Sequence, residues 1–383
     1  MSLPFPLNPV LDRLPVYQPG RPIGEVAREL GLPEARIIKL ASNENPHGPS
    51  PATLEAMHAA LDQVWLYPDG SCQALKAALA RHLGVAPQCL SIGNGSNDLL
   101  MLLAEAFLSS KCSAVYSQYG FAIYPLVIRA TGARAIEVPA LARTSSMPFG
   151  HDLAAMAAAV RPDTRLLFIA DPNNPTGTWA QAHELERLLQ AVPTSTLVVL
   201  DEAYYEYARE RDLPDRLPWI GSHPNLILLR TFSKAHGLAG ARVGYAISHP
   251  EIAEVLDRLR PAFNVNAVAQ AGAVAALADA QHMRRSVEAT MREQARLCAE
   301  LSRLGLWFAP SAGNFLLVEI GPRAAEVFQA LLARGLIVRP LANYALPDYL
   351  RISVGLPEHN ERLLAALAEL CPTAAPARPA RAR

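Results

Sequence analysis

Short apolar segments alternate with amphipathic helical segments through the middle of this 383-residue chain. Apolar and β-branched residues predict strands at 113–117, 135–138, 166–170, 196–200, 226–230 and 243–247. Between them lie helical patterns such as 181–191, where leucines recur at helical spacing. Strands that are nearly continuous in apolar residues are typical of parallel sheets buried on both faces. The alternation therefore predicts an α/β lobe with a mostly parallel sheet covered by helices.

The pattern changes after residue 260. A long charged helix is predicted at 280–303, strands at 314–320, 336–340 and 349–354, and helices at 323–334 and 361–370. Gly335 stands where a glycine commonly ends a helix. We predict an N-terminal arm (1–50) that contributes to the small lobe and the substrate site, a large domain (51–260), a small α+β domain (261–370) and a disordered Pro/Ala/Arg-rich tail (371–383).

Composition narrows the class of protein. The formal net charge is zero and no basic stripe is present, so nothing suggests a nucleic-acid or acidic-membrane partner. The chain starts without the pattern of a signal peptide, and the apolar segment 99–108 is shorter than the ~20 residues that span a bilayer. Five cysteines are scattered without a C-x-x-C pair. We therefore expect unpaired thiols, no metal site and a cytoplasmic protein.

Two ionisable residues directly follow predicted buried strands. Lys234 closes the sequence Thr-Phe-Ser-Lys after the strand 226–230, and Asp201 follows the strand 196–200. The lysine could bind a phosphate, form an imine with a carbonyl compound, or lie solvated in a loop. The aspartate could cap the next helix or balance a protonated ring nitrogen. Both fall at the carboxyl ends of strands, where open α/β sheets bind ligands.

Two further segments add polar groups to that edge. The turn 171–177 contains Asn174, whose amide could bond a ring hydroxyl, although turn chemistry alone also explains this composition. The segment 93–98 begins a helix with glycines, Ser96 and Asn97, which suits either a phosphate or an ordinary N-cap. Tyr119 could stack on a planar ring. Together a lysine, an aspartate, an asparagine and a phosphate-type turn describe one ligand, a phosphorylated pyridine aldehyde.

Four motifs, in this order and spacing, resemble those of the fold-type I aminotransferases that depend on pyridoxal 5′-phosphate (PLP). They are Asn-Asn-Pro-Thr-Gly at 173–177, Asp-Glu-Ala-Tyr at 201–204, Ser-Lys-Ala at 233–235 and Gly-Ala-Arg-Val-Gly-Tyr at 240–245. The resemblance extends to about residue 370. Within the family, the histidinol-phosphate aminotransferases are similar at 17–21, 42–46, 67–69, 231–242 and 350–355. It implies a fold-type I transferase whose large lobe has a sheet of seven-stranded type.

The resemblance also implies a role for each matching residue. Lys234 would join the PLP aldehyde as a Schiff base, and Asp201 would pair with the pyridine nitrogen. The phenolic oxygen of PLP would bond Asn174 and Tyr204, and its ring would stack on Tyr119. The phosphate would be held by Ser96, Asn97, Thr231, Ser233 and Arg242. Tyr67 would reach the phosphate of the neighbouring subunit, which makes a homodimer part of the prediction.

The predicted substrate residues lie outside that group. Leu350, Ile352 and Val354 fall on one face of a strand, so Arg351 points to the other and could bind an anion bidentately. By resemblance Arg351 would bind the carboxylate of glutamate or 2-oxoglutarate and the phosphate of histidinol phosphate. Arg339, Tyr17 and Asn45 would complete the substrate site, although an ion pair and a packed arm equally suit Arg339 and Tyr17.

The resemblance implies transfer of an amino group from histidinol phosphate to 2-oxoglutarate in histidine biosynthesis, which yields imidazole acetol phosphate and glutamate. Three alternatives remain open: an aromatic amino-acid aminotransferase, a PLP-dependent threonine-phosphate decarboxylase, and a non-catalytic PLP-sensing module. The sequence departs from the family pattern at Ser96-Asn-Asp98, where Ala-Asp-Glu is commoner, and at Asp171, where small or cysteine residues are common. Neither departure affects Lys234 or Asp201.

Overall fold

The computed structural model describes residues 10, 14–16, 20–211 and 213–372, and these residues form two compact units. The first unit contains residues 44–289 and 310–314, and the second contains 20–43, 290–309 and the chain from Phe315 onward. The sequence prediction began the small domain at 261. The structure instead groups 261–289 with the first unit, because α10 (Ala267–Ala278) packs on α2 (Pro51–Leu61) and α3 (Gln73–Leu83).

The predicted arm is divided in the same way, with 20–43 in the second unit and 44–50 in the first. The predicted disordered tail lies outside the described residues from position 373 on.

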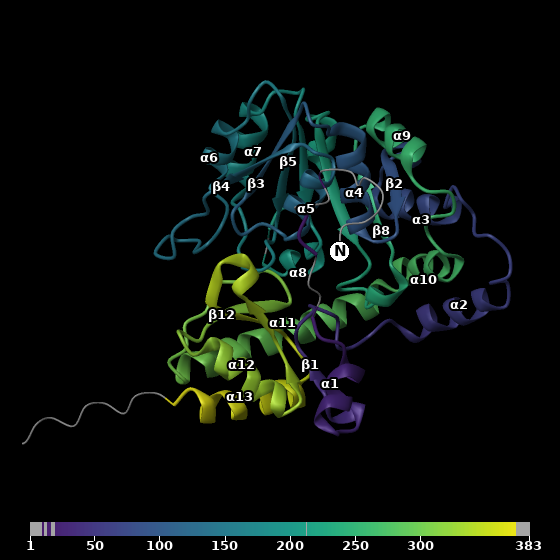
Figure 1. The fold of residues 1–383 in the computed structure, drawn as a ribbon. Coiled ribbons are helices and arrows are strands. Elements are labelled where there is room, and N and C mark those ends of the chain that lie inside the picture. The colour runs from purple at the N-terminus through teal and green to yellow at the C-terminus, as the bar shows by residue number, and fades with distance from the viewer. Residues whose placement is uncertain (1–9, 11–13, 17–19, 212, 373–383) are drawn as a thin grey trace, which may run out of the picture. The chain divides into compact units, whose positions relative to one another are not determined.

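A seven-stranded sheet forms the centre of the first unit (Figure 1). Its order is β2 (Leu90–Gly93), β8 (Gly244–Ile247), β7 (Leu226–Thr231), β6 (Leu197–Asp201), β5 (Thr164–Ala170), β3 (Ser113–Ser117) and β4 (Arg134–Val138). β8 runs antiparallel to both of its neighbours, and the other pairs are parallel. This confirms the mostly parallel α/β sheet. The sequence prediction missed β2, which has only four residues and ends in glycine.

Side chains of successive strand residues point to opposite faces of the sheet, so each face has its own core. On one face, strand residues such as Phe168 and Val199 pack against α4 (Ser96–Phe107), α5 (Ile123–Ala130) and α9 (Pro250–Leu259). On the other, residues such as Ile169 and Leu200 pack against α3, α6 (Leu153–Ala158), α7 (Ala182–Ala191) and α10. Each fully buried side chain of this size contributes about 1.5–3 kcal/mol, so burial fixes which residues face which core.

Helix starts in this unit follow local sequence signals. Ser50 accepts a hydrogen bond from Thr53 N–H (3.2 Å) and precedes Pro51, the first residue of α2. Asn266 caps α10 by accepting from Ala269 N–H at 2.8 Å. Short side-chain acceptors in this position satisfy the free N–H groups of a first turn. One further α-helix, α8, covers Tyr205–Arg209.

The second unit combines small sheets with helices. β9 (Phe315–Glu319), β12 (Leu346–Ser353) and β11 (Arg339–Leu341) form an antiparallel sheet, and β1 (Ile38–Lys39) pairs in parallel with β10 (Leu336–Ile337). Its helices are α1 (Ile23–Leu30), α12 (Ala324–Ala333), α13 (Pro357–Leu370) and the part of α11 (Ala280–Arg303) from Thr290 on. The single strand predicted at 336–340 is therefore two, because Ile337 pairs with Lys39 whereas Arg339 pairs with Arg351.

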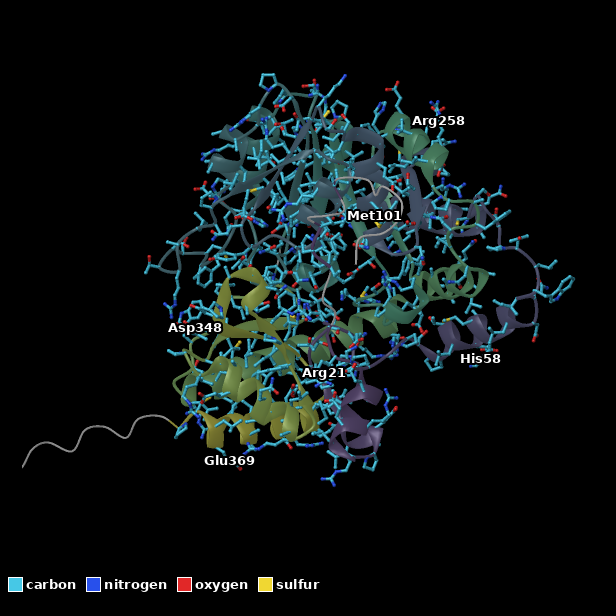
Figure 2. The ribbon with its side chains drawn as sticks, in the orientation of Figure 1. Arg21, His58, Met101, Arg258, Asp348 and Glu369 are labelled. Carbon is cyan, nitrogen blue, oxygen red and sulfur yellow. The ribbon has the colours of Figure 1, made fainter. Side chains whose placement is uncertain are left out.

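Short 3₁₀ helices complete the two units: η2 (Glu34–Arg36), η3 (Pro87–Cys89), η4 (Leu217–Gly221), η5 (Ala239–Ala241) and η6 (Ala342–Tyr344). Charged side chains such as Arg258 and Glu369 point outward from their helices (Figure 2). Across the described residues, every helix is too short or too polar to cross a membrane.

Candidate cofactor and substrate site

A buried carboxylate and a half-buried amine lie at the carboxyl edge of the large sheet. Asp201 is the last residue of β6 and is 5% exposed. Lys234 follows the end of β7 by three residues, and its Nζ lies 5.8 Å from the ring centre of Tyr204. Burial raises the pKa of Asp201 to about 6, and the charge of Lys234 acts in the opposite direction. The structure thus brings together Lys234, Asp201 and Tyr204, as the sequence predicted.

Asp201 has two hydrogen-bond donors of its own. Tyr124 Oη, on α5, donates to Oδ2 at 3.1 Å, and the N–H of Ala203 donates to Oδ1 at 3.2 Å. Both bonds stabilise the ionised carboxylate and lower its pKa, although less than burial raises it. Tyr124 was not among the residues predicted from the sequence. It is fully buried and nothing in its spacing distinguishes it from a core tyrosine.

The loops after β5 and β3 are joined beside this pair. Asn173 Nδ2 donates to the carbonyl of Tyr119 and to Thr176 Oγ1, both at 2.8 Å. The Tyr119 ring lies edge-on to Phe149, with centroids 5.4 Å apart. Asn174, next in the chain, is half-buried. The two loops that carry Asn174 and Tyr119 are therefore held together by Asn173.

The start of α4 and Arg242 form a cradle for an anion. Gly95 precedes the helix with a φ of 84°, and a β-carbon there would lie 2.3 Å from Nη2 of Arg242. Arg242 Nη1 also donates to Ser233 Oγ at 3.3 Å. A β-carbon on Gly244 would come within 2.5 Å of the N of Ser96. Glycines at these two positions let backbone N–H groups, a guanidinium and a hydroxyl approach one point, which suits a phosphate.

The acid in the first turn of the same helix has hydrogen-bond donors of its own. Asp98, in the first turn of α4, accepts from the N–H of Asn94 (2.8 Å) and from Asn264 Nδ2 (3.0 Å). Thr231 Oγ1 accepts from the N–H of Ser233 at 3.1 Å and so shapes the turn that leads to Lys234. Of the predicted phosphate residues, Ser96, Ser233 and Arg242 thus lie around one helix start, with Thr231 beside Ser233.

A family model for aminotransferases of class I and II matches residues 35–367. The chain belongs to this family. It is 50% identical to histidinol-phosphate aminotransferase 2 of Pseudomonas fluorescens (strain Pf0-1), over 94% of this chain and 96% of that relative. A crystal structure of histidinol-phosphate aminotransferase from Sinorhizobium meliloti in complex with pyridoxal-5′-phosphate superposes with a TM-score of 0.85 at 33% identity, over 95% of this chain and 97% of that one.

A more distant neighbour shares only the fold. L-threonine-O-3-phosphate decarboxylase from Porphyromonas gingivalis superposes with a TM-score of 0.76 at 22% identity, over 87% of this chain and 99% of that one. The family assignment agrees with the resemblance found in the motifs, and the fold is that of the fold-type I enzymes.

Asn45, a predicted substrate residue, forms hydrogen bonds within the first unit. It is 8% exposed, and its Nδ2 donates to the carbonyl of Ala235 and to Ser286 Oγ, both at 2.8 Å. Asn45 thus fastens the loop that carries Lys234, and its contact with substrate stays a prediction. Tyr67 is 82% exposed and stacks on Phe263 at 4.6 Å. Tyr17 lies outside the described residues.

The two predicted substrate arginines belong to the second unit, where they are cross-strand partners on β11 and β12. Arg351 is 7% exposed, donates to the carbonyl of Ala41 at 2.5 Å and lies 5.6 Å from the ring centre of Phe315. Leu350, Ile352 and Val354 lie in the core of this unit, as predicted. The backbone pairing places the two arginines directly opposite one another on neighbouring strands.

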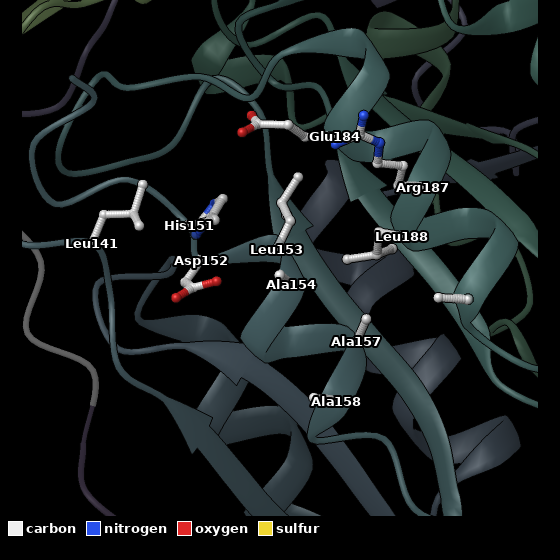
Figure 3. A pocket seen from close by; sticks show the side chains of 11 residues that line it. Leu141, His151, Asp152, Leu153, Ala154, Ala157, Ala158, Glu184, Arg187 and Leu188 are labelled. Carbon is white, nitrogen blue, oxygen red and sulfur yellow. The ribbon is translucent and has the colours of Figure 1, made fainter. Parts of the chain in front are cut away.

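Other features of the first unit lie away from these residues. A hollow of about 520 Å³ lies between α6 and α7, lined by residues such as His151, Glu184 and Arg187 (Figure 3). The predicted site residues do not line it. In the described part of the chain, no group of three His, Cys, Asp or Glu side chains is placed to hold a metal ion.

Proposed function

We propose that the protein is a PLP-dependent aminotransferase that transfers an amino group from histidinol phosphate to 2-oxoglutarate in histidine biosynthesis. The observation that carries the proposal is the clustering of an amine, a buried carboxylate and an anion cradle at one sheet edge. The substrate follows from the relative that is 50% identical over nearly the whole chain and bears that name.

The residues of the first unit fit PLP chemically. When bound, PLP supplies an aldehyde that joins amines and a protonated pyridine ring that accepts electrons. Asp201 would hold the proton on the ring nitrogen, and Asn174 and Tyr204 would bond the phenolic oxygen. Tyr119 would cover the ring face. The cradle at Gly95 and Arg242 would bind the phosphate.

Lys234 carries the catalytic proton transfer in this proposal. Its Nζ would take the proton from the substrate α-carbon and deliver it to C4′ of the cofactor, as a general base and then a general acid. Asn45 keeps the loop after Lys234 in place through the carbonyl of Ala235.

Arg351 and Arg339 are the proposed anion site for substrates. A guanidinium fixed on a strand binds a carboxylate or phosphate bidentately. Histidinol phosphate and 2-oxoglutarate both carry such a group, so one pair of arginines would serve both halves of the reaction.

We also propose a homodimer. Large apolar side chains are exposed along α2 and the segment that follows it, namely Leu54, Leu61, Val64, Trp65, Leu66 and Tyr67. Phe263, on which Tyr67 stacks, is also exposed. A patch of this kind is typical of an interaction surface. Tyr67 belongs to it, and the family resemblance implies that Tyr67 of one copy would reach the phosphate cradle of the other. The unpaired cysteines favour a cytoplasmic location.

Lys234→Ala tests the proposal, with the exposed Lys111→Ala as matched control. We expect transamination, and the pyridoxyl label that borohydride reduction leaves on the protein, to vanish in the first variant only. Steady-state assays with histidinol phosphate, phenylalanine and threonine phosphate, each with 2-oxoglutarate, identify the substrate. Turnover that survives in Lys234→Ala would sink the aminotransferase proposal, whereas a preference for phenylalanine or release of CO₂ from threonine phosphate would change only the substrate. A PLP-sensing protein would show no turnover at all.

A further inference from the structure

A cluster of buried charged side chains lies next to the site residues. One of its members, Glu202, directly follows Asp201 in the sequence. Asp201 contacts Tyr124, whereas Glu202 contacts Arg216 and Arg230. Successive residues at a strand end point to opposite faces of the sheet. The cluster that contains Glu202 therefore lies on the face of the sheet opposite to the carboxylate of Asp201.

This cluster, here called the Arg216 network, contains Asp171, Arg216, Glu202, Arg230 and Asp215. Arg216 pairs with Asp171 Oδ2 through Nη2 and lies 3.5 Å from Glu202 Oε1 through Nη1. Arg230 Nε donates to Glu202 Oε2 at 2.8 Å, and its Nη2 donates to Asp215 Oδ1 at 3.0 Å. The first four side chains are at most 2% exposed, and Asp215 is 35% exposed.

Stability alone does not account for such a network. Desolvation of buried ions offsets most of their attraction, so well-packed apolar residues of equal volume often stabilise a fold as well or better. What charged pairs add is a fixed geometry, because each guanidinium donates its hydrogen bonds only in its own plane. The network is therefore suited to fixing the positions of the segments that it joins.

The network joins the strand ends on which the proposed cofactor contacts depend. Asp171 immediately follows β5 and lies three residues before Asn174. Glu202 immediately follows Asp201. The backbone adds one bond between these ends, from Asp171 N–H to the carbonyl of Asp201 at 2.9 Å. Arg216 comes from a separate segment, before η4, and joins both ends at once.

We propose that Arg216 is a positioning residue that sets the spacing between the ends of β5 and β6, and thereby between Asn174 and Asp201. This inference rests on the proposed function, in which Asp201 bonds the nitrogen and Asn174 the phenolic oxygen of one pyridine ring. A ring held by both requires that their separation is constant. Displacement of a catalytic group by about 1 Å can cost on the order of a hundredfold in rate.

Asp171→Asn is the first test, because it keeps the shape of the side chain and its acceptor for Ala180 N–H (2.8 Å) but removes its charge. We expect the apoenzyme to fold, with PLP affinity and kcat each lowered by about tenfold or more. The KM for 2-oxoglutarate should change little, because Arg351 and Arg339 bind that substrate. Lys76→Met is the control. It breaks the pair of Lys76 with Asp257 (2.8 Å) in the same unit, and should lower the melting temperature without changing PLP affinity.

The double variant Asp171→Leu, Arg216→Met separates position from stability. Apolar replacement of the pair should return the melting temperature of the apoenzyme toward that of the wild type, while PLP affinity stays low. Recovery of both quantities, or wild-type PLP affinity and kcat in Asp171→Asn, overturns the inference alone. A wild-type protein that binds no PLP overturns the proposed function and this inference with it.

Discussion

Replacement of Tyr124 by phenylalanine should move the pH dependence of PLP binding. The phenol donates a 3.1 Å hydrogen bond to Asp201 Oδ2, and both side chains are buried. Phenylalanine retains the ring contacts of Tyr124, which stacks on Phe168 at 5.0 Å and lies edge-on to Phe121 at 5.9 Å. The variant therefore removes one bond from the carboxylate and leaves the packing in place.

The size of the effect follows from the charge of the acceptor. A hydrogen bond to an ionised group contributes about 1.5–3 kcal/mol, and one pKa unit corresponds to about 1.4 kcal/mol. Loss of the bond disfavours the ionised form, so the pKa of Asp201 in the apoenzyme should rise from about 6 to about 7–8. Protonated Asp201 cannot hold the proton of the ring nitrogen. PLP affinity should therefore decline on the acid side of pH 6 in the wild type, and already near neutral pH in Tyr124→Phe.

The assay is a titration of the apoenzyme with PLP, followed by fluorescence, at a series of pH values. Tyr116→Phe is the matched control, because Tyr116 Oη donates to Glu137 at 3.0 Å on the same sheet without contact to Asp201. We expect equal affinities for the two variants at high pH and a separation as pH falls. Superimposable profiles for wild type and Tyr124→Phe would refute the assignment of Asp201 as the ring-nitrogen partner or of Tyr124 as its donor.

Three further predictions concern the cradle, the substrate arginine and the exposed patch. Gly95→Ala should displace Arg242 and weaken PLP binding about tenfold, a loss of ~1.4 kcal/mol, while binding of unphosphorylated pyridoxal is unchanged in the same fluorescence titration. Arg351→Lys should raise the KM for 2-oxoglutarate on the order of tenfold in steady-state kinetics, because an ammonium does not reproduce the bidentate contact. Trp65→Glu should abolish the proposed dimer in light scattering, since its side chain is 78% exposed within the apolar patch.

The sheet and most of its strands could be predicted because their evidence is local. β5 and β7 contain continuous apolar segments; β5 is followed at once by Asp171, and the apolar part of β7 ends in Arg230 and Thr231. β2 escaped prediction because its four residues carry too little pattern, and it is a strand only through its pairing with β8. The boundary at 261 was displaced for a similar reason. The Ala-rich α10 belongs to the large unit through its contacts with α2 and α3, which composition does not reveal.

The candidate site could likewise be predicted only where its evidence is local. Residues at strand ends, such as Lys234 and Asp201, are recognisable from their position after apolar segments. Tyr124 and Arg216 are not, because each contacts a strand end across a long stretch of sequence: 77 residues separate Tyr124 from Asp201, and 45 separate Arg216 from Asp171. The departure at Asp171 was visible in the sequence. Its reason, a buried arginine partner, required the fold.

The adjacent acids Asp201 and Glu202 show why these separate observations belong together. Two neighbouring buried carboxylates would repel each other and destabilise the sheet edge if both lacked a counter-charge. Glu202 has two guanidiniums, those of Arg216 and Arg230. Asp201 has a phenol, a backbone N–H and the nearby charge of Lys234, and its pKa stays raised. The protein's own arginines thus balance the charge of Glu202, whereas the charge of Asp201 is balanced less completely. A protonated pyridine ring would supply the missing positive charge.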